Sequence, residues 1–499
     1  MLVAVGAGGC SAGHSPLPNA VPSLMGVRGL ARIAAIGRQP PTEMMIGFLM
    51  TDGSVMTQNN YGSDWYRYAP DSKGDYAKGT WTQLASLPKG YGPSAYASQV
   101  IADGRLVVSG GEYNDPGNNY PLQLTNLGAV YDPLTNKWTR LGHPAGWPWI
   151  GDSPSTMLPD GRMLMGQKLT KRDAYLDPKT LQWTAIGDKG KSDFNSEEGW
   201  TLLPDGTVLT ADVKNSPNSE IYNPSTGVWK SAGSTIVDLR SPGEPGCVRY
   251  GPKTKDCYYP PGEIGPALLR PDGTVFATGA GPEASGYGTG HTAIYHTTGT
   301  SAGTWTAGPD FPTGQNAGDS YGILEPSGNV LVLTTSSTLD EFNGSTFTQV
   351  GTAAGPPVLL PTGQVLMLGA NQTVIYTPTG KAQAAWAPTI KTAPSSVVAG
   401  KTYKITGTQF NGLSQAVAFG DEEQNATAYP LVRITNDSTH HVFYARTHDH
   451  STMGVATGTK LVWTYFDVPK KIDAGTSTLE VVANGIASKP VKVSVSGSR

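Results

Sequence analysis

Seven hairpin-like segments recur along the chain of 499 residues, and this repeat limits the possible folds more than any other feature. In each segment two β-prone runs flank a tight turn, as in FLMTDGSVM, QVIADGRLVVSGG, TMLPDGRMLMG, TLLPDGTVLTA, ALLRPDGTVFATG, GILEPSGNVLVL and VLLPTGQVLMLG. The turn glycines are Gly53, Gly104, Gly161, Gly206, Gly273, Gly328 and Gly363. Because both central residues of such turns tolerate positive φ, Asp-Gly between β-prone runs is a strong hairpin signal. The pattern therefore predicts seven antiparallel hairpins.

An aromatic residue follows each hairpin, often after an Asp-Pro or Asn-Pro turn, at Trp81, Trp138, Trp183, Trp229, Trp305, Phe347 and Trp386. The turn glycines are 35 to 67 residues apart, which brackets the kelch period of about 50. A single four-stranded unit cannot bury both faces of its sheet, whereas seven units arranged radially can. We therefore predict a seven-bladed, kelch-like β-propeller over residues 40–390, with these aromatic side chains packed between its sheets.

The repeat stops after residue 390. Alternating segments such as KTYKITG, TKLVWTYFDV and STLEVVANG then predict an immunoglobulin-like β-sandwich over residues 393–499. Residues 1–39 are interpreted as a leader or signal remnant and a linker. The predicted fold class is all-β, in keeping with 15% charged residues, 63 glycines and 39 prolines.

Charge and hydropathy exclude two classes of partner. The net charge is −3 and there is no basic run, so we expect no nucleic-acid partner. No apolar stretch reaches the roughly 18 residues that a membrane span needs. We expect a monomer.

The N-terminal run MLVAVGAGGCSAG is compatible with the end of an export signal, with a lipid anchor at Cys10, or with a flexible leader. In an exported protein, Cys247 and Cys257 would form a disulfide, and free buried thiols are the alternative. The expected location is extracellular, periplasmic or, for a lipoprotein, the outer membrane.

Acidic residues recur at one end of the predicted channel. The strand that enters each Asp-Gly turn is the innermost of its blade, and its opposite end lies nine or ten residues before the turn glycine. Those positions hold Glu43, Asp152, Glu197, Glu263 and Asp319. We predict that Asp152, Glu197, Glu263 and Asp319 face one another as candidate catalytic residues. The alternative is that they only cap strands or bond neighbouring turns.

Aromatic residues in the long loops at the same end are candidate substrate-binding groups, namely Trp147, Trp149, Tyr258, Tyr259 and Tyr287. Aromatic rings stack on sugar C–H faces while carboxylates accept hydroxyl protons, so a carbohydrate or another polyhydroxylated ligand suits this surface. Two chemistries are open: acid–base cleavage of a glycosidic bond, as in a glycosidase or lyase, or binding of a metal ion.

Four of the eight histidines fall within residues 440–450, in STHHVF and RTHDHSTMG. We predict that this loop of the C-terminal domain faces the carboxylates, either as imidazolium or with His448 and His450 as ligands of a divalent metal ion. The sequence identifies no other cofactor.

The propeller followed by a sandwich resembles galactose oxidase and its relatives, the copper-radical oxidases, over residues 40–499. The segments YARTHDHSTMG and YFDVPKKIDAGTSTLEVVANGIAS carry the closest resemblance. It implies that a loop histidine enters the channel as a copper ligand, at the position of His448. The family's Tyr-His pair is replaced by Gly318-Asp319, and no tyrosine stands at the other ligand position. Neither Cys247 nor Cys257 lies where its thioether requires. The resemblance thus implies the fold but not the radical cofactor.

Three functions follow as hypotheses. The first is an exported protein that binds and processes a carbohydrate at the propeller mouth. The second is a non-catalytic cell-surface binding module, in which the acids are structural. The third is a copper-dependent oxidase of the galactose or glyoxal oxidase type.

Overall fold

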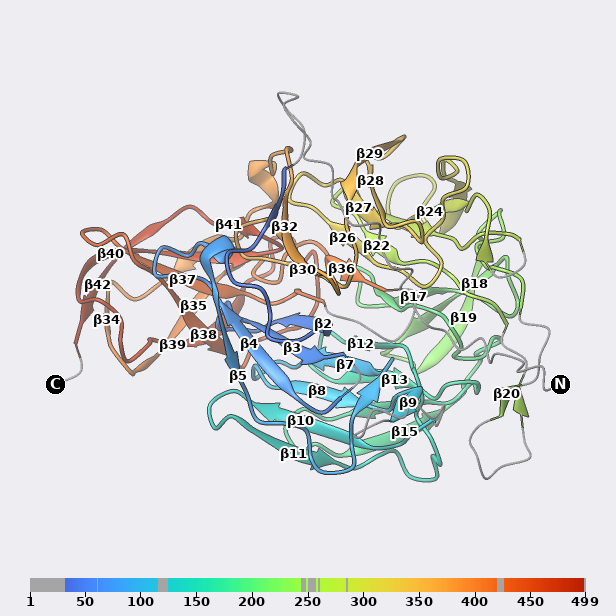
Figure 1. Cartoon of the computed structure of the whole chain (residues 1–499), viewed down its shortest axis with the longest axis horizontal. Coiled ribbons are helices and arrows are strands. Elements are labelled where there is room, and N and C mark those ends of the chain that lie inside the picture. The colour runs from blue at the N-terminus through green and yellow to red at the C-terminus, as the bar shows by residue number, and fades with distance from the viewer. Residues whose placement is uncertain are drawn as a thin grey trace.

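The computed structural model describes residues 32–60, 62–114, 124–243, 248–249, 257–258, 261–283, 286–419 and 426–497. Seven antiparallel sheets form the seven blades of a propeller, and a further, curled sheet lies at one side of it, on the left in Figure 1. This confirms the predicted all-β class and the number of blades. No helix in the described part is long and apolar enough to cross a membrane.

The first four blades follow the chain in order. The first blade consists of β2 (Met44–Leu49), β3 (Val55–Asn59), β4 (Trp65–Ala69) and β5 (Thr80–Gln83), and the second of β7 (Ala97–Val100), β8 (Leu106–Ser109), β10 (Gly128–Asp132) and β11 (Lys137–Leu141). The third blade consists of β12 (Ser155–Met157), β13 (Met163–Gly166), β14 (Asp173–Leu176) and β15 (Trp183–Gly187). The fourth consists of β16 (Thr201–Leu202), β17 (Val208–Ala211), β18 (Asn218–Asn223) and β19 (Val228–Ser234).

The last three blades are β22 (Ala267–Leu269), β23 (Thr274–Thr278), β24 (Thr292–His296) and β25 (Thr304–Ala307); then β26 (Gly322–Leu324), β27 (Val330–Leu333), β28 (Thr338–Phe342) and β29 (Phe347–Thr352); then β30 (Pro357–Leu359), β31 (Val365–Leu368) and β32 (Thr373–Thr377) with β1 (Arg32–Ala35). Two short pairs lie in loops, β6 (Pro93–Ser94) with β9 (Tyr113–Asn114), and β20 (Val248–Arg249) with β21 (Cys257–Tyr258). The first strands of the blades line the axis, where β12 packs between β7 and β16.

Turn chemistry and aromatic packing explain why the repeat folds in this way. Gly104 has φ of +84°, a conformation that favours glycine. A Cβ there would also lie 2.7 Å from Thr51 Oγ1, so the turn has little space for a side chain. Three tryptophans reach the preceding blade: Trp138 donates to Ala85 O (3.0 Å), Trp229 to Asp173 Oδ2 (2.7 Å) and Trp305 to Ser219 Oγ (2.8 Å). The predicted position of these rings between sheets is confirmed.

The seventh blade departs from the sequence pattern, because its outer strand comes from the N-terminal side of the propeller. Residues Arg32–Ala35, which the sequence analysis assigned to the leader and linker, form β1 and pair antiparallel with β32. Trp386 instead ends the short 3-10 helix η3 (Ala384–Trp386), and its ring lies against the turn glycine Gly328. Pairing of β1 with β32 joins the two ends of the propeller segment and closes the ring, and β1 covers the edge that β32 would otherwise expose.

The C-terminal strands form one curled sheet of nine strands in the order β33 (Thr389–Thr392), β35 (Thr402–Thr408), β39 (Val462–Asp467), β38 (Val442–His448), β37 (Leu431–Asn436), β40 (Gly475–Ala483), β42 (Val491–Ser496) and β34 (Ser396–Val398), with β41 (Ile486–Ala487) beside β40. Its inner face packs around Ile405, Val432 and Leu479.

This sheet docks on the face of the propeller that carries the hairpin turns. Backbone bonds run from Thr447 N to Thr51 O (3.1 Å), from His450 N to Ala102 O (3.2 Å) and from Met453 N to Pro159 O (3.1 Å). Each of these acceptors lies in a turn region of one of the first three blades.

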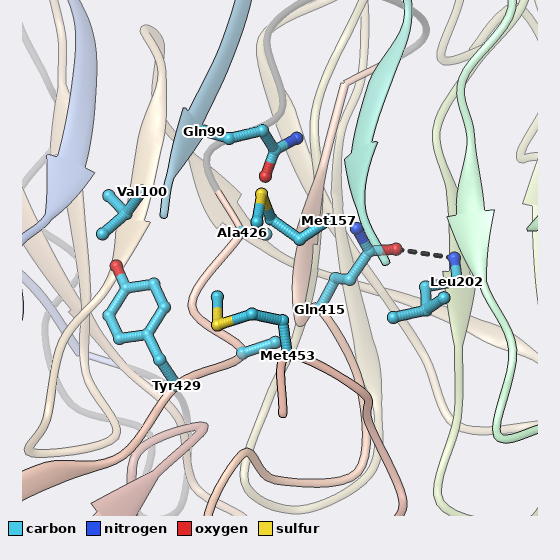
Figure 2. A pocket seen from close by; sticks show the side chains of 9 residues that line it. Gln99, Val100, Met157, Leu202, Gln415, Ala426, Tyr429 and Met453 are labelled. Carbon is cyan, nitrogen blue, oxygen red and sulfur yellow. Dashed lines mark hydrogen bonds between the residues drawn. The ribbon is translucent and has the colours of Figure 1, made fainter. Parts of the chain in front are cut away.

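A segment of the C-terminal region enters the channel. Its strand β36 (Val417–Ala418) pairs antiparallel with β26 and packs against β22 and β30. Gln415 spans further blades, because its Oε1 accepts from Leu202 N (2.8 Å) and its Nε2 donates to Thr156 Oγ1 (3.0 Å). Beside Gln415 remains a cavity of about 10 Å³ lined by Met157, Tyr429 and Met453 (Figure 2). That volume is close to the space of one water molecule.

Candidate functional site

The predicted carboxylates gather at the end of the channel opposite the hairpin turns. Asp152 and Asp319 lie three residues before β12 and β26, and Glu197 and Glu263 lie four residues before β16 and β22. The carboxylates act on one another electrostatically, as Glu197 does on Asp319. The innermost strands thus bring these acids together, as their geometry predicts.

The centre of this carboxylate cluster is a lysine. Lys168 Nζ donates to Oδ2 of Asp152 and lies 2.6 Å from Oε1 of Glu197. All three side chains are buried, with 1%, 4% and 6% of their surface exposed. The backbone N of Lys168 is held by Ile150 O and Ser153 Oγ, both at 3.0 Å. A buried ammonium is stable only when paired, so Lys168 and its two carboxylates form one unit.

Three acids of the cluster have raised pKa values. Burial raises the pKa of Asp152 to about 7, although Lys168 acts in the opposite direction. Burial, and then the charge of Glu197, raise the pKa of Asp319 to about 6. Burial and the charge of Asp152 hold the pKa of Glu112 well above its usual range. Carboxyl groups that titrate near neutral pH can donate or accept a proton during a reaction.

Two of the acids have a strained backbone. Glu197 has φ of +53° and Asp319 has φ of +50°, in the left-handed region that residues with a Cβ rarely adopt. Such conformations persist where the surrounding structure fixes them, and they are more frequent at functional sites. Asp319 and Glu263 are partly exposed, whereas Asp152, Glu197 and Glu112 are buried. A ligand at the mouth would therefore meet Asp319 and Glu263 first.

Lys168 and Glu112 were not among the site residues predicted from the sequence. Both follow the second strand of a hairpin, Lys168 two residues after β13 and Glu112 three residues after β8. Since the second strand returns to the end where the first one starts, its exit positions reach the same part of the channel. The charged residues just after the second strand of each hairpin are therefore the signal that points to Lys168 and Glu112.

The predicted aromatic residues differ in accessibility. Trp147 is buried, with 3% of its surface exposed, so its ring faces are not available to a ligand, contrary to the prediction. Trp149 is half-buried and donates from Nε1 to Lys168 O at 3.0 Å. Tyr287 is 71% exposed. Its loop adjoins that of Asp319, because Asn316 donates to Gly288 O at 3.2 Å. The side chain of Tyr258, and all of Tyr259, lie outside the described residues.

The prediction that the histidine loop faces the carboxylates is wrong. The loop packs on the hairpin-turn face, at the opposite end of the channel. The imidazole of His448 lies between Asp449 Oδ2 (2.8 Å from Nδ1) and Asp467 Oδ1 (3.2 Å from Nε2). His450 is buried beside Thr464, and burial lowers its pKa to about 3. The sequence could not show which C-terminal segment enters the channel, because strand pairing at β36 is non-local.

The residues do not fit a copper ion of the galactose oxidase type. Residues 413–419 and 426–429, the described part of the segment that enters the channel, contain no histidine. Within the described ranges, moreover, no three His, Cys, Asp or Glu side chains are arranged to hold a metal ion. His448 and His450 are therefore placed by hydrogen bonds to protein groups. Cys10 and Cys247 lie outside the described residues, so the lipid anchor and the disulfide to Cys257 stay predictions.

A second buried acidic cluster lies next to the first and surrounds Lys191. Its Nζ lies 2.8 Å from Glu198 Oε1 and 3.2 Å from Glu220 Oε2, and 4.4 Å from the centre of the Trp229 ring. Asp212 is also close, with 1% exposure, and both its carboxylate oxygens are buried with no hydrogen-bond partner among the residues that the structure describes. Because the segment 191–198 contains both Lys191 and Glu197, this Lys191 cluster anchors the loop that delivers Glu197 to the channel.

Replacing Asp212 by asparagine is expected to stabilise the protein at high pH. Burial, and then the charge of Glu220, raise the pKa of Asp212 to about 8. The folded state thus holds a proton that the unfolded state releases, so stability falls as pH rises from about 4 to 8. Asparagine cannot ionise, and a shift of one pKa unit corresponds to about 1.4 kcal/mol. The full shift from 3.8 to about 8 sets an upper limit of about 5 kcal/mol at pH 8, and we expect a gain in unfolding free energy of at least about 2 kcal/mol there and little at pH 4.

Urea unfolding of Asp212→Asn at both pH values measures this gain. The matched control is Asp188→Asn, which changes an exposed carboxylate in the turn before Lys191 and should change stability little. An equal effect of Asp212→Asn at pH 4 and pH 8 would contradict the assignment of the proton to Asp212.

Comparisons with known proteins give only distant likenesses to solved structures. No family model matches the chain, and no curated protein matches it. A fungal alcohol oxidase of the AA5 family, solved in complex with copper, is 14% identical with a TM-score of 0.49, over 94% of this chain and 99% of that chain. A streptogramin B lyase is 11% identical with a TM-score of 0.46, over 70% of this chain and 98% of that chain.

A virginiamycin B lyase from Staphylococcus aureus is 12% identical with a TM-score of 0.44, over 70% of this chain and 99% of that chain. At such identities and TM-scores these likenesses carry no argument about chemistry. The molecule is a seven-bladed β-propeller with a curled C-terminal sheet and a buried lysine–carboxylate cluster at one end of its channel.

Proposed function

We propose that this is an exported protein that binds a carbohydrate at the carboxylate end of the propeller and cleaves it by acid–base chemistry. The observation that supports this most is the Lys168 cluster, in which one ammonium lies between Asp152 and Glu197 while neighbouring carboxyl groups titrate near neutral pH. Protonatable carboxyl pairs at a cleft are the chemical requirement for cleaving a glycosidic bond.

In this proposal Asp319 and Glu263 are the catalytic residues, because they are the partly exposed members of the cluster. Asp319, with a pKa of about 6, is the general acid that protonates the departing glycosidic oxygen. Glu263 is the base that takes a proton from water, whose oxygen bonds to the anomeric carbon as the glycosidic bond breaks. Glu197 and Lys168 are buried and act as positioning residues, since after burial their charges have the largest effects on the pKa of Asp319, and Asp152 holds Lys168 in place. Tyr287 and Trp149 are candidate stacking surfaces for the sugar rings.

Incubation with a panel of soluble polysaccharides, followed by assay of new reducing ends and of unsaturated products, tests the proposal. We expect cleavage of at least one polysaccharide, with a rate that falls as pH rises through about 6 because Asp319 loses its proton. Asp319→Asn and Glu263→Gln should each lower the rate by about 100-fold or more. The control Asp310→Asn changes an exposed acid that bonds His291 Nδ1 at 2.7 Å, and should retain activity.

Two results would decide against this reaction. Binding of a polysaccharide without any product would favour the non-catalytic binding module, and loss of that binding in Asp319→Asn would still place the ligand at the mouth. Unchanged cleavage in both Asp319→Asn and Glu263→Gln would place the chemistry elsewhere. Export is a separate part of the proposal, and fractionation of cells that express the full chain tests it.

A further inference from the structure

The histidine loop borders a groove that the proposed function does not use. The groove has a volume of about 410 Å³ and lies between the second blade and the curled sheet. Asp103, Arg105 and Asp132 line it from the propeller, and Arg446, His448 and Asp449 line it from the sheet. The carboxylate cluster lies at the other end of the channel, so this turn-face groove is a separate place on the molecule.

The cations of the turn-face groove are already engaged by protein groups. Arg446 Nη1 lies 3.0 Å from Asp467 Oδ2, and Arg105 Nη2 lies 2.6 Å from Asp103 Oδ2. His448 bridges Asp449 and Asp467. Asp449 nevertheless has 63% of its side chain exposed. Four carboxylates therefore face two guanidinium groups and one imidazole, and the fixed walls offer hydrogen-bond acceptors to a ligand that carries hydroxyl groups.

An exposed aromatic strip continues from this groove along β39. Its alternate residues Val462, Thr464 and Phe466 are buried, whereas Leu461, Trp463 and Tyr465 are 57%, 39% and 36% exposed. Because side chains two apart on a strand share one face, Trp463 and Tyr465 stand about 7 Å apart on the outer surface. The Tyr465 ring stacks with His448, at 5.9 Å between centroids and 22° between planes. His448 thus joins the aromatic strip to the groove.

The strip belongs to the same sheet face that docks on the propeller. On β38, next to β39, Tyr444 packs against the turn glycine Gly53, and Arg446 Nη2 donates to Asp103 O at 2.6 Å. One strand further out, Trp463 and Tyr465 extend this face beyond the propeller, where they are 39% and 36% exposed. The turn-face groove and the aromatic strip therefore meet at a corner, with carboxylates on one side and aromatic rings on the other.

We propose that this corner is a second carbohydrate-binding site, for a neutral oligosaccharide or polysaccharide chain. A pyranose ring has an apolar C–H face that stacks on aromatic rings and a rim of hydroxyl groups that donate to carboxylates. The ammonium of Lys404, 4.4 Å from the Trp463 ring centre, supplies a donor for ring or hydroxyl oxygens on the same surface. A stable protein partner would need roughly 1,000 Å² of complementary area, whereas the exposed apolar side chains here are few and border charged groups.

Affinity electrophoresis of the full chain tests this site, in native gels that contain a soluble β-glucan, a galactomannan or an arabinogalactan. We expect at least one of these neutral polysaccharides to retard the protein. Trp463→Ala combined with Tyr465→Ala should weaken that retardation about tenfold, which corresponds to about 1.4 kcal/mol. The conservative pair Trp463→Phe and Tyr465→Phe should retain most of it. Because both side chains are partly exposed, the Ala variant should keep its melting temperature, which circular dichroism checks.

Asp319→Asn and Glu263→Gln are included to separate the two sites. Retardation that persists in these mouth variants but is lost in the Ala pair supports the corner site, whether or not the mouth proposal holds. The proposal is overturned if no neutral polysaccharide retards the protein or if the Ala pair leaves retardation unchanged. Retardation by a polyuronate alone, abolished by salt, would indicate attraction by surface lysines and would also overturn it.

Discussion

Replacing Lys168 by methionine is expected to lower the free energy of unfolding by about 3–5 kcal/mol at pH 8, and by clearly less at pH 5. The ammonium lies between Asp152 and Glu197, and all three side chains are buried. Without it, two carboxylates would face each other away from water, where an uncompensated charge is costly. At pH 5 Asp152, with a pKa of about 7, already holds a proton, so the repulsion is smaller.

Chemical denaturation of Lys168→Met at the two pH values measures this difference. The control is Lys179→Met, which removes an exposed lysine from the turn before β15. Adding Glu197→Gln to Lys168→Met should recover part of the loss at pH 8, because the pair of unlike charges is then removed together. A loss of the same size at pH 5 and pH 8, without recovery in the double variant, would mean that Lys168 contributes by packing alone.

Deleting residues 1–35 is expected to destabilise the propeller by on the order of 4 kcal/mol, or to leave it insoluble. The deletion removes β1, which contributes four residue pairs to the seventh blade and packs Ile33 against the blade next to it. The loss combines ladder hydrogen bonds of about 1 kcal/mol each with the burial of Ile33. It also exposes β32 as an open edge, which favours aggregation.

A shorter deletion, of residues 1–28, is the matched control because it leaves β1 intact. Thermal unfolding and size-exclusion chromatography compare the two. We expect the longer deletion alone to melt earlier and to form aggregates. Equal stability of both proteins would show that β1 is not needed to hold the ring closed.

The sequence predicted what depends on local chemistry. Asp-Gly turns such as Asp52-Gly53 determine hairpins by themselves, and the aromatic after each hairpin marks the outer strand of most blades. Asp152 and Asp319 could be placed at one end of the channel because the length of an inner strand is fixed by its residues.

The remaining features depend on pairing between distant parts of the chain. The four residues of β1 contain neither a turn nor an aromatic, and ring closure alone decides their position. The same holds for β36, whose two residues pair with β26 far upstream. A cluster of imidazoles indicated a metal site, yet His448 and His450 are explained by their hydrogen bonds to Asp449, Asp467 and Thr464.

The segment that enters the channel blocks passage through the propeller at the end next to the curled sheet. Because Gln415 and β36 fill the end next to the curled sheet, a ligand at Asp319 and Glu263 arrives and departs through the same opening. Under the proposed function, a polymer could not pass through the propeller and would have to approach these acids from the mouth. Its products would leave by the same opening and would compete there with incoming substrate.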